Sequence, residues 1–515
     1  MNTLRTLMNT VGLSLTVLVG VVTSSGAATL VVNRTDDNGA PHTLRWAILQ
    51  NNLAPGQHRI EIHPTGDVNG EWVIRPTSLL PPIVGPAVIE GRHRDGRGHS
   101  DDDHDHDHEG DGVGVGNAPD VVIDGSSIID PTTMASCPAE NGIGNGPNVR
   151  SLQKPMLAVV DSGNVDISGL EIRNICIGIM LLRSHDNRIH HNVIHDTLGA
   201  AGVLITGDAG DATGSPTVDL SIHNVVEHNT IYDTGDGGEC TRGSTYITYR
   251  FNRLFQSSPN TIAPRSQALE CASTGNDHID LIGNTISGYS DGMQLNSATN
   301  VLVERNKITA STYGITTSGT DVMIRDNVIT RNRMGVGPAK AAHVTITHNA
   351  IYDNGQPILS LPTSAGGTTN PASPALLGID LGVDGVTPND LAASCADGFP
   401  DCDTTQNFPV LGAGSSWQPN GRVTLAGTLP SRPHATFAID FYASHAPNAA
   451  GFVEGEVYLG SQSVTTDATG NATFSFIAPT KNPLRDDSHS AIFTATATNA
   501  SGATSEFSAG LLLAR

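Results

Sequence analysis

Short runs of alternating apolar and polar residues fill the middle of the chain. Val301, Val303 and Ile308 are apolar around Asn306, and Gly314 opens the next such run. The same order of residue types recurs from Val322 to Ile329 and again at Gly335. Alternation with a period of two predicts short β-strands, because a helix would repeat its apolar positions every three to four residues.

An asparagine marks the same place in successive units. Five of the seven intervals between these places are 21 to 23 residues long, and the other two, of 37 and 32 residues, are interpreted as loop insertions. A repeat of about 22 residues predicts a solenoid of stacked units. The places are Leu170, Asn192, Asn229, Asn252, Asn284, Asn306, Asn327 and Asn349.

Each unit has room for three short strands separated by turns. One unit cannot bury its apolar side chains alone, but a stack of units shares a continuous aliphatic core. The pattern therefore predicts an all-β fold, a parallel β-helix, over residues 29–355. Asparagines at one turn can hydrogen-bond along the stack, so we interpret their column as structural.

The segment before the repeats is interpreted as the start of this β-helix. Thr29–Asn33 and Arg59–His63 alternate like strands, and Thr43–Asn52 has the spacing of a short amphipathic α-helix. We expect that α-helix to cover the open end of the core, where strand edges would otherwise be unpaired. Residues 91–116 are rich in His, Asp and Gly and are expected to form a disordered insert.

The pattern changes after the repeats. Residues 356–406 form a linker rich in Pro, Gly, Ser and Thr, followed by a loop that holds Cys395 and Cys402. Residues 407–515 contain five longer alternating runs with turn signals between them. This spacing is typical of a small antiparallel, Ig-like β-sandwich, which would act as a spacer or contact carbohydrate.

The first 28 residues have the pattern of a secretory signal, with Arg5, an apolar run and small residues at its end. No apolar run is long enough to span a bilayer, so we expect an exported protein, secreted or at the cell surface, without a membrane span. The formal net charge is −23, which argues against nucleic acid as a partner. We expect a monomer whose partner is a polysaccharide or a cell-surface glycan.

Several segments resemble a bacterial family of exported right-handed β-helix proteins. Thr43–Gln50 is similar to the "SLREAI" segment that opens this family, and Ile379–Asp390, Gln406–Leu411 and Thr465–Phe474 are similar to its C-terminal region. The repeats also resemble the pectate-lyase-like superfamily, which implies a substrate groove on the strand that follows the glycine of each unit. The Arg-x-Pro-x-x-Arg motif of one pectate lyase group is absent, as are the Gly-His-Gly and Arg-Ile-Lys motifs of polygalacturonases.

Aligning the units on their asparagines places two Glu-Cys pairs in register. Glu239 and Glu270 then point outward from adjacent rungs, and Cys240 and Cys271 point inward behind them. Adjacent rungs lie about 4.8 Å apart, which a disulfide tolerates. The register predicts either a Cys240–Cys271 disulfide or two stacked buried thiols, and a disulfide between Cys395 and Cys402 is expected in the later loop.

The same alignment gathers further polar residues on this face. Asp236 and Asp291 each lie one residue before an equivalent glycine, Gln294 lies in the column of the two glutamates, and Arg242 and Arg265 fall nearby. Long insertions border the region, and long loops over a rigid stack often carry function. We predict Glu239, Glu270, Arg242 and Arg265 as catalytic, and Asp236, Asp291 and Gln294 as substrate-binding.

The predicted function is cleavage of a uronate-containing polysaccharide by β-elimination. Such a lyase needs a cation to neutralise the uronate carboxylate, and calcium held by Asp236, Glu239, Glu270 and Asp291 would suit. Its base would be an Arg, His or Lys, whereas a glycoside hydrolase would use two of these carboxyl groups. The alternatives are such a hydrolase, a solvated acidic patch, and a non-catalytic surface or adhesion protein.

Two histidine clusters are further candidate sites. His185, His190, His191, His195 and Asp196 surround one turn and could hold a metal or a base, although scattered histidines are common in such turns. The histidines of the insert, interleaved with aspartates, would bind transition metals weakly and without fixed geometry. They are His99, His104, His106 and His108.

Overall fold

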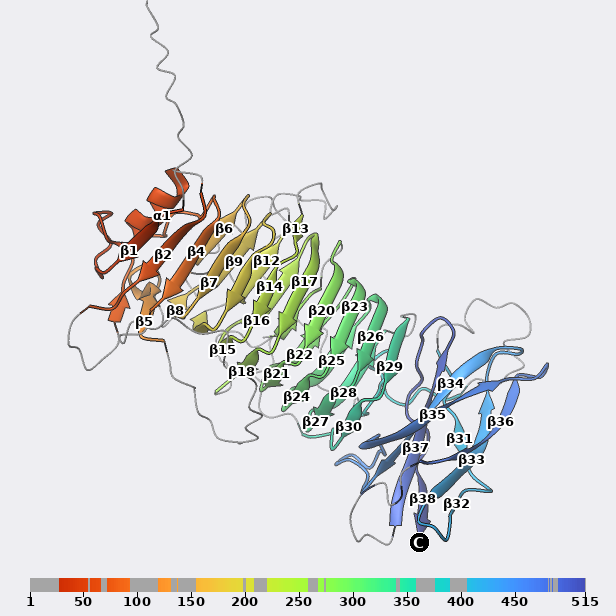
Figure 1. The fold of residues 1–515 in the computed structure, drawn as a ribbon. Helices are drawn as coiled ribbons and strands as arrows, with labels where there is room; N and C mark the ends of the chain where they lie inside the picture. The colour runs from red at the N-terminus through yellow and green to blue at the C-terminus, as the bar shows by residue number, and fades with distance from the viewer. Residues whose placement is uncertain are drawn as a thin grey trace, which may run out of the picture.

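A computed structural model shows a parallel β-helix followed by a β-sandwich (Figure 1). The predicted signal, most of the His/Asp insert, Arg265, Cys395 and Cys402 lie outside the described residues. The described residues are 27–53, 56–65, 72–92, 119–130, 137, 154–197, 201–207, 220–257, 267–272, 275–339, 343–357, 376–389, 405–479, 481, 484 and 490–514.

Three parallel sheets form the walls of the β-helix, as the repeat predicted. We call them sheets A, B and C. Sheet A contains β1 (Thr29–Val32), β2 (His58–Ile62), β4 (Ala87–Gly91), β7 (Val165–Ser168), β10 (Arg188–His190), β14 (Val225–Glu227), β17 (Ser244–Arg250), β20 (Asp277–Ile282), β23 (Thr299–Glu304), β26 (Thr320–Arg325) and β29 (Val344–Thr347), with β13 (Ser221–Ile222) beside β17. Sheet B contains β3 (Trp72–Ile74), β5 (Val121–Asp124), β8 (Leu170–Ile175), β11 (Val193–Thr197), β15 (Thr230–Tyr232), β18 (Arg253–Phe255), β21 (Thr285–Ser287), β24 (Lys307–Thr309), β27 (Val328–Thr330) and β30 (Ala350–Tyr352).

Sheet C is the strand layer that follows the glycine of each unit. Its strands lie in chain order along the β-helix axis, one to a rung. They are β6 (Pro155–Val160), β9 (Ile177–Leu182), β12 (Ala201–Thr206), β16 (Asp236–Thr241), β19 (Gln267–Glu270), β22 (Asp291–Gln294), β25 (Tyr313–Thr317) and β28 (Met334–Pro338).

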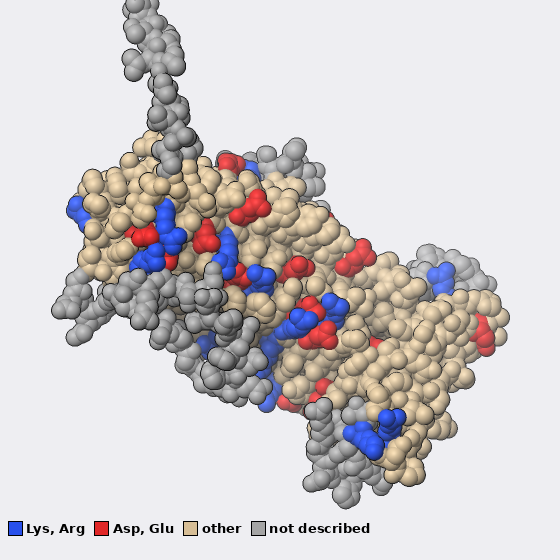
Figure 2. All heavy atoms as spheres, in the orientation of Figure 1, with Lys and Arg blue, Asp and Glu red and all other residues tan. Residues whose placement is uncertain are grey.

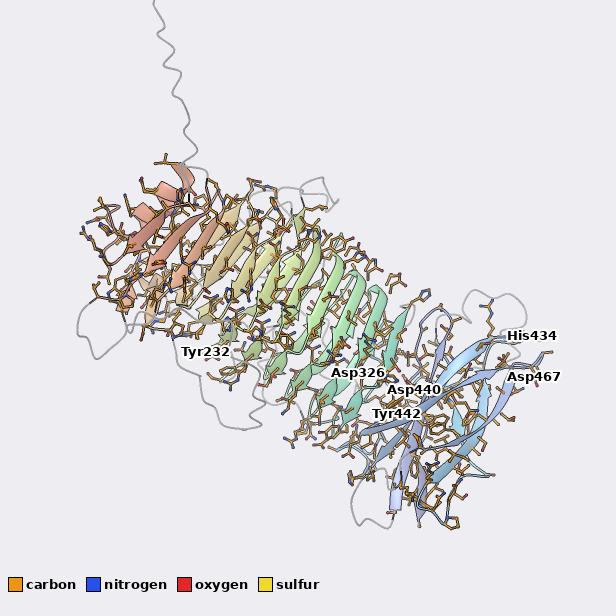
Figure 3. All side chains as sticks on the ribbon, viewed as in Figure 1. Tyr232, Asp326, His434, Asp440, Tyr442 and Asp467 are labelled. Carbon is orange, nitrogen blue, oxygen red and sulfur yellow. A yellow bond between two sulfur atoms is a disulfide. The ribbon has the colours of Figure 1, made fainter. Side chains whose placement is uncertain are left out.

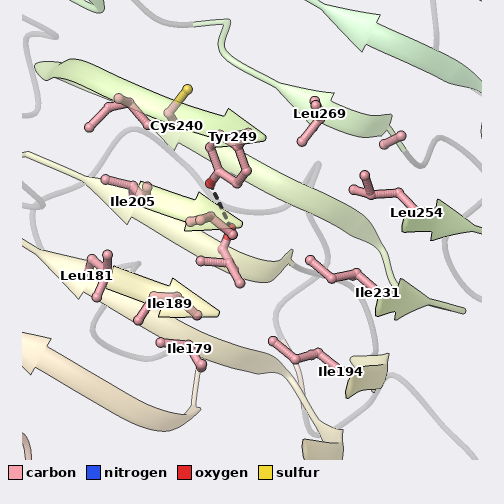
Figure 4. Packing of buried hydrophobic residues seen from close by; sticks show 14 of the residues in the cluster. Ile179, Leu181, Ile189, Ile194, Ile205, Ile231, Cys240, Tyr249, Leu254 and Leu269 are labelled. Carbon is pink, nitrogen blue, oxygen red and sulfur yellow. Dashed lines mark hydrogen bonds between the residues drawn. The ribbon is translucent and has the colours of Figure 1, made fainter. Parts of the chain in front are cut away.

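The interior is a single column of buried aliphatic side chains. Ile194, Ile231 and Leu254 from sheet B meet residues such as Ile205 and Leu269 from sheet C (Figure 4). The ring of Tyr249 also lies in this column, and its hydroxyl donates to the Glu239 carbonyl at 3.1 Å. Burial of stacked aliphatic residues is the main stabilising contribution that one rung receives from the next.

The asparagine column is the ladder that the repeat predicted. The backbone N–H of Asn284 donates to the side-chain oxygen of Asn306 at 2.8 Å, and Asn306 donates in the same way to Asn327. The side-chain amide of Asn306 donates to the Leu281 carbonyl at 2.7 Å. Each asparagine therefore satisfies backbone groups that a tight turn leaves open.

The glycine of each unit is required by close approach of the next rung. A Cβ on Gly292 would lie 2.5 Å from the Gly314 carbonyl oxygen, and one on Gly314 would lie 2.4 Å from that of Gly335. No larger residue fits these contacts without a shift of the backbone. The recurring glycine is therefore a packing requirement of sheet C.

Both ends of the β-helix are covered. Helix α1 (Leu44–Leu53) packs Leu44, Ala47 and Ile48 into the first rungs, as its amphipathic spacing predicted. At the other end, Ile379 pairs with Val336 of sheet C, and Gly455 of the sandwich pairs with Ile351 in β30, the last strand of sheet B. Residues 376–389, within the expected linker, thus extend the wall of the β-helix.

The C-terminal domain is an antiparallel β-sandwich, as predicted. One sheet contains β31 (Val410–Leu411), β33 (Val423–Pro430), β32 (Ser416–Trp417) and β36 (Asn471–Ile477). The other contains β35 (Val457–Thr465), β34 (Thr436–Ser444), β37 (Ser490–Asn499) and β38 (Leu511–Ala514). Phe437, Phe441 and Phe493 fill its core. The ring of Phe441 is therefore not available to stack on a sugar. Among the described residues, no helix has the length and apolar character to cross a membrane.

Candidate active site

The predicted polar residues lie in two columns on the outward face of sheet C. The register pairs Glu239 with Glu270 and Glu270 with Gln294, which is the column that the repeat predicted. The second column passes from Asp236 through the rung of Gln267 to Asp291, and Asp291 pairs with Tyr313. Neighbouring strands lie about 4.8 Å apart, so polar groups from three to four rungs are brought together.

A disulfide lies directly behind the two glutamates. A disulfide bridges Cys240 and Cys271, with a Cα–Cα distance of 4.6 Å. Of the two predicted alternatives, the disulfide is therefore confirmed over a pair of stacked buried thiols. A second disulfide joins Cys137 to Cys176. Its pairing was not predicted, because Cys137 lies outside the repeated units. The Cys240 bridge ties β16 to β19 at the point where their carboxylates face outward.

Asp291 is a buried carboxylate of this face with a perturbed pKa. Its side chain is buried, and burial raises its pKa to about 7, against a weak hydrogen bond of 3.5 Å from the Ser290 hydroxyl. Burial also raises the pKa of neighbouring Tyr313, and the charge of Asp291 adds to this. A carboxyl group with a pKa near 7 exchanges its proton at neutral pH, which suits an acid or a base.

Asp236 is held by the backbone of the next rung. Its carboxylate accepts the backbone N–H of Gln267 at 2.8 Å, although it is almost completely buried. Gly237 follows it, and a Cβ there would lie 2.5 Å from both the Ala268 carbonyl oxygen and the Leu254 side chain. The glycine lets β16 lie close to β19 and fixes the position of Asp236.

Apolar residues border the polar columns on both sides along the axis. Leu204 pairs with Glu239 and Ala201 with Asp236, and both belong to a buried outward-facing cluster. On the other side, Tyr313 packs with Met334. The polar part of this face is therefore about three rungs wide, and its neighbours exclude water.

Two arginines adjoin the columns. Arg242 follows β16 and is partly exposed. Arg333, which was not predicted, precedes β28 and lies close enough to Tyr313 to oppose the rise in its pKa. Arg333 lies one residue before Met334, which is two rungs after Asp291 in the same column. The spacing of the repeat could therefore have identified Arg333.

One relative matches this chain over nearly the whole length of both proteins. The chain is 30% identical over 514 residues to the 3-dehydroshikimate dehydratase of Acinetobacter baylyi, which covers 96% of this chain and 97% of the relative. The chain belongs to the family of this dehydratase. The family described as right handed beta helix region also matches residues 267–370.

Solved structures share the β-helix with this member of the dehydratase family. The alginate lyase from Paenibacillus sp. str. FPU-7 is 13% identical over 64% of this chain and 97% of its own, with a TM-score of 0.34. The pectate lyase Pel9A is 11% identical over 72% of this chain and 89% of its own, with a TM-score of 0.35.

The histidines of the predicted cluster form ion pairs and stack on aromatic rings. His195 lies between Asp196 at 2.7 Å and Glu171 at 3.3 Å, and stacks on Tyr232. Although burial opposes its charge, the hydrogen bonds to these carboxylates raise the pKa of His195 to about 9. The protonated form of His195 is therefore favoured at neutral pH, which suits an ion pair better than a general base.

The described residues contain no group of three or more His, Cys, Asp or Glu side chains arranged to hold a metal ion. The four carboxylates predicted to bind calcium are distributed over two columns and three rungs rather than directed at one point. Calcium at these residues stays a prediction. On the face drawn in Figure 2, acidic and basic side chains lie side by side along the β-helix.

Proposed function

We propose that this chain is a carbon–oxygen lyase that dehydrates 3-dehydroshikimate or a closely related cyclic hydroxy-keto acid. The observation that supports the proposal is the 30% identity to a 3-dehydroshikimate dehydratase over nearly the whole length of both chains. The sequence-based prediction of β-elimination describes the same class of bond cleavage, in which a proton and a β-oxygen leave neighbouring carbons.

The reaction needs one base, one acid and a site for a carboxylate. The base removes the proton from the carbon beside the ketone, and the electron pair of that bond forms a new double bond. The C–O bond on the next carbon then breaks, and the departing hydroxyl takes a proton from the acid and leaves as water. Proton shifts convert the resulting ring to an aromatic dihydroxybenzoate.

The outward face of sheet C offers groups for each role. Asp291, whose pKa is raised to about 7, is the proposed acid, because a carboxyl group of ordinary pKa would be ionised at neutral pH. Glu239 or Glu270 is the proposed base, since both lie one to two rungs away in the adjoining column. Arg333 and Arg242 are proposed to bind the substrate carboxylate.

The burial of this face favours a small ring over a polymer. Leu204, Asp236 and Met334 point outward yet are almost completely buried, so sheet C is not an open groove along the axis. Glu270, Gln294 and Thr316 are partly exposed on three successive rungs. These rungs span roughly 10 Å, a length that suits a single six-membered ring.

The second candidate is the predicted uronate polysaccharide lyase, with calcium as its proposed cation. One observation favours it: Glu270, Gln294 and Thr316 lie in a single line along the axis, and a line of polar groups can contact successive sugar residues. A glycoside hydrolase and a non-catalytic adhesion protein are the remaining alternatives. We also propose that the chain is exported, because two disulfides are typical of oxidising compartments.

A substrate panel tests the proposal. Purified residues 29–515 are incubated with 3-dehydroshikimate, pectate, alginate and neutral glycans, with calcium and with chelator. Ultraviolet absorbance reports the aromatic product or unsaturated uronides, and a reducing-end assay reports hydrolysis. Formation of dihydroxybenzoate that is lost in Asp291→Asn supports the dehydratase.

The other outcomes decide between the alternatives. Unsaturated uronides without turnover of 3-dehydroshikimate would replace the dehydratase with a polysaccharide lyase. Reducing ends alone would indicate a hydrolase. No product from any substrate, with correct folding verified by circular dichroism, would favour the surface protein.

A further inference from the structure

Three carboxylates of the sandwich contact the end of the β-helix, one near each sheet. The carboxylate of Asp440 in β34 accepts a hydrogen bond from the Thr347 hydroxyl at the edge of sheet A, and Figure 3 shows Asp440 at this junction. Glu454 accepts the backbone N–H of Asn354, just after sheet B. Glu506 binds the segment that extends sheet C. The sandwich is therefore attached to all three walls.

Glu454 terminates a second asparagine ladder. Ser311 donates its backbone N–H to Asn332 at 3.0 Å, Asn332 donates to Asn354 at 3.1 Å, and Asn354 donates to Glu454 at 3.0 Å. The carboxylate thus takes the place that an asparagine of a further rung would occupy. Its side chain is 2% exposed, and its other oxygen has no hydrogen-bond partner.

Glu506 fastens the segment that covers sheet C. Its two carboxylate oxygens accept the backbone N–H groups of Leu381 at 3.1 Å and Thr387 at 3.0 Å. Glu506 is 3% exposed, and it borders a cavity of about 330 Å³ between the two domains, which Phe452 and Phe507 also line. The segment also pairs with sheet C through the backbone, and Glu506 is the buried acid that joins it to the sandwich.

The surroundings of both glutamates are acidic or neutral. Asp353 raises the pKa of Glu454, and Asp380 raises that of Glu506. Burial is the larger cause, and each pKa reaches about 7 although backbone N–H donors oppose the rise. Within the described part of the chain, neither glutamate forms an ion pair with Lys, Arg or His.

We propose that this junction is a proton-controlled clamp, in which protonated Glu454 and Glu506 hold the sandwich on the β-helix and their ionisation loosens it. The folded-state pKa of each lies above the ordinary value, so the docked form binds protons more tightly than a form in which these groups are hydrated. The docking free energy from these protons is fully present below the ordinary pKa of glutamate. It is lost as the pH rises through about 7.

Undocking has a structural consequence. The pairings of Ile351 with Gly455 and of Val344 with Thr504 would open, which exposes the strand edges at the end of the β-helix. Exposed parallel edges pair with other chains. A rise in pH would therefore convert a form with a covered end into a form able to self-associate.

Hydrogen–deuterium exchange of residues 29–515 tests the clamp. Labelling at pH 5.5, 7.0 and 8.5, with times corrected for the chemical exchange rate, follows the amides of Asn354, Leu381 and Thr387. We expect their protection to fall about tenfold or more across this range in the wild-type protein. The double variant Glu454→Gln/Glu506→Gln keeps a neutral hydrogen-bonding group, and its protection should change less than about threefold.

A matched control is Glu456→Gln, which removes a partly exposed carboxylate two residues from Glu454 and should follow the wild type. Equal loss of protection in the double variant, or no loss in the wild type, would overturn the proposal. Each single variant is measured as well, and if neither they nor the double variant fold, the wild-type profile alone decides. Dehydratase activity does not enter this test, so its outcome is independent of the proposed function.

Discussion

The outward faces of sheets A and C both carry stacked carboxylates, and several of those on sheet A form ion pairs with arginines. Glu227 lies between Arg188 and Arg250, and Glu61 pairs with Arg59 and Arg92. On sheet C, Asp291 lies buried against a serine and a tyrosine.

This difference appears in the proton affinities. Burial favours the neutral acid in both places, but hydrogen bonds from Arg250 and Arg188 lower the pKa of Glu227, whereas burial raises the pKa of Asp291 to about 7. A paired carboxylate of depressed pKa stabilises the stack. One buried beside polar residues, without such compensation, costs stability and is suited to chemistry.

The largest expected effect is the loss of activity in Asp291→Asn. The substitution keeps the size of the side chain but removes its proton exchange, so kcat for dehydration should fall by about 100-fold or more. The control is Asp280→Asn, in the same rung but on sheet A. The assay measures formation of the aromatic product. If kcat falls equally in both variants, the carboxylate on sheet C has no greater role in catalysis than the one on sheet A.

Glu227→Gln should have the opposite profile. It leaves two arginines beside a neutral, almost completely buried group, and the free energy of unfolding should fall by about 2 kcal/mol. Urea unfolding followed by circular dichroism measures this loss. Activity per folded molecule should stay at the wild-type level, and a parallel loss of kcat would erase the distinction between the two faces.

The pH dependence should separate the two faces as well. Asp291 must be protonated to act as an acid, so kcat/KM should fall about tenfold per pH unit above about 7. The stability from Glu227 and Glu61, whose pKa values are lowered, is present above the ordinary pKa and lost as the pH falls below it. Activity that instead rises through pH 7 would assign Asp291 as the base.

The smallest effect is expected for Tyr313→Phe. Removal of one hydroxyl next to Asp291 should lower kcat about three- to tenfold and shift the pH midpoint of activity, because the neighbouring charge distribution changes. The same assay gives both values. An unchanged midpoint would indicate that Tyr313 belongs to the apolar border with Met334 and not to the polar columns.

Much of the architecture was predictable because it repeats. The asparagine spacing located the turns, and the strand period placed Glu239 beside Glu270 and Cys240 beside Cys271, as the register and the disulfide show. The amphipathic run at residues 43–52 and the alternation after residue 407 identified the N-terminal cap and the sandwich. These features depend on local periodicity, which a single sequence displays.

Other features depend on contacts between distant segments. The pairing of Cys137 with Cys176, the position of Arg333 near Tyr313 and the three carboxylates that fasten the sandwich have no periodic signature. The sequence alone determined the β-helix, because every rung obeys the same local rule. Only the tertiary structure decided which carboxylates are paired and which are buried without an arginine, because burial and pairing depend on how distant segments pack together.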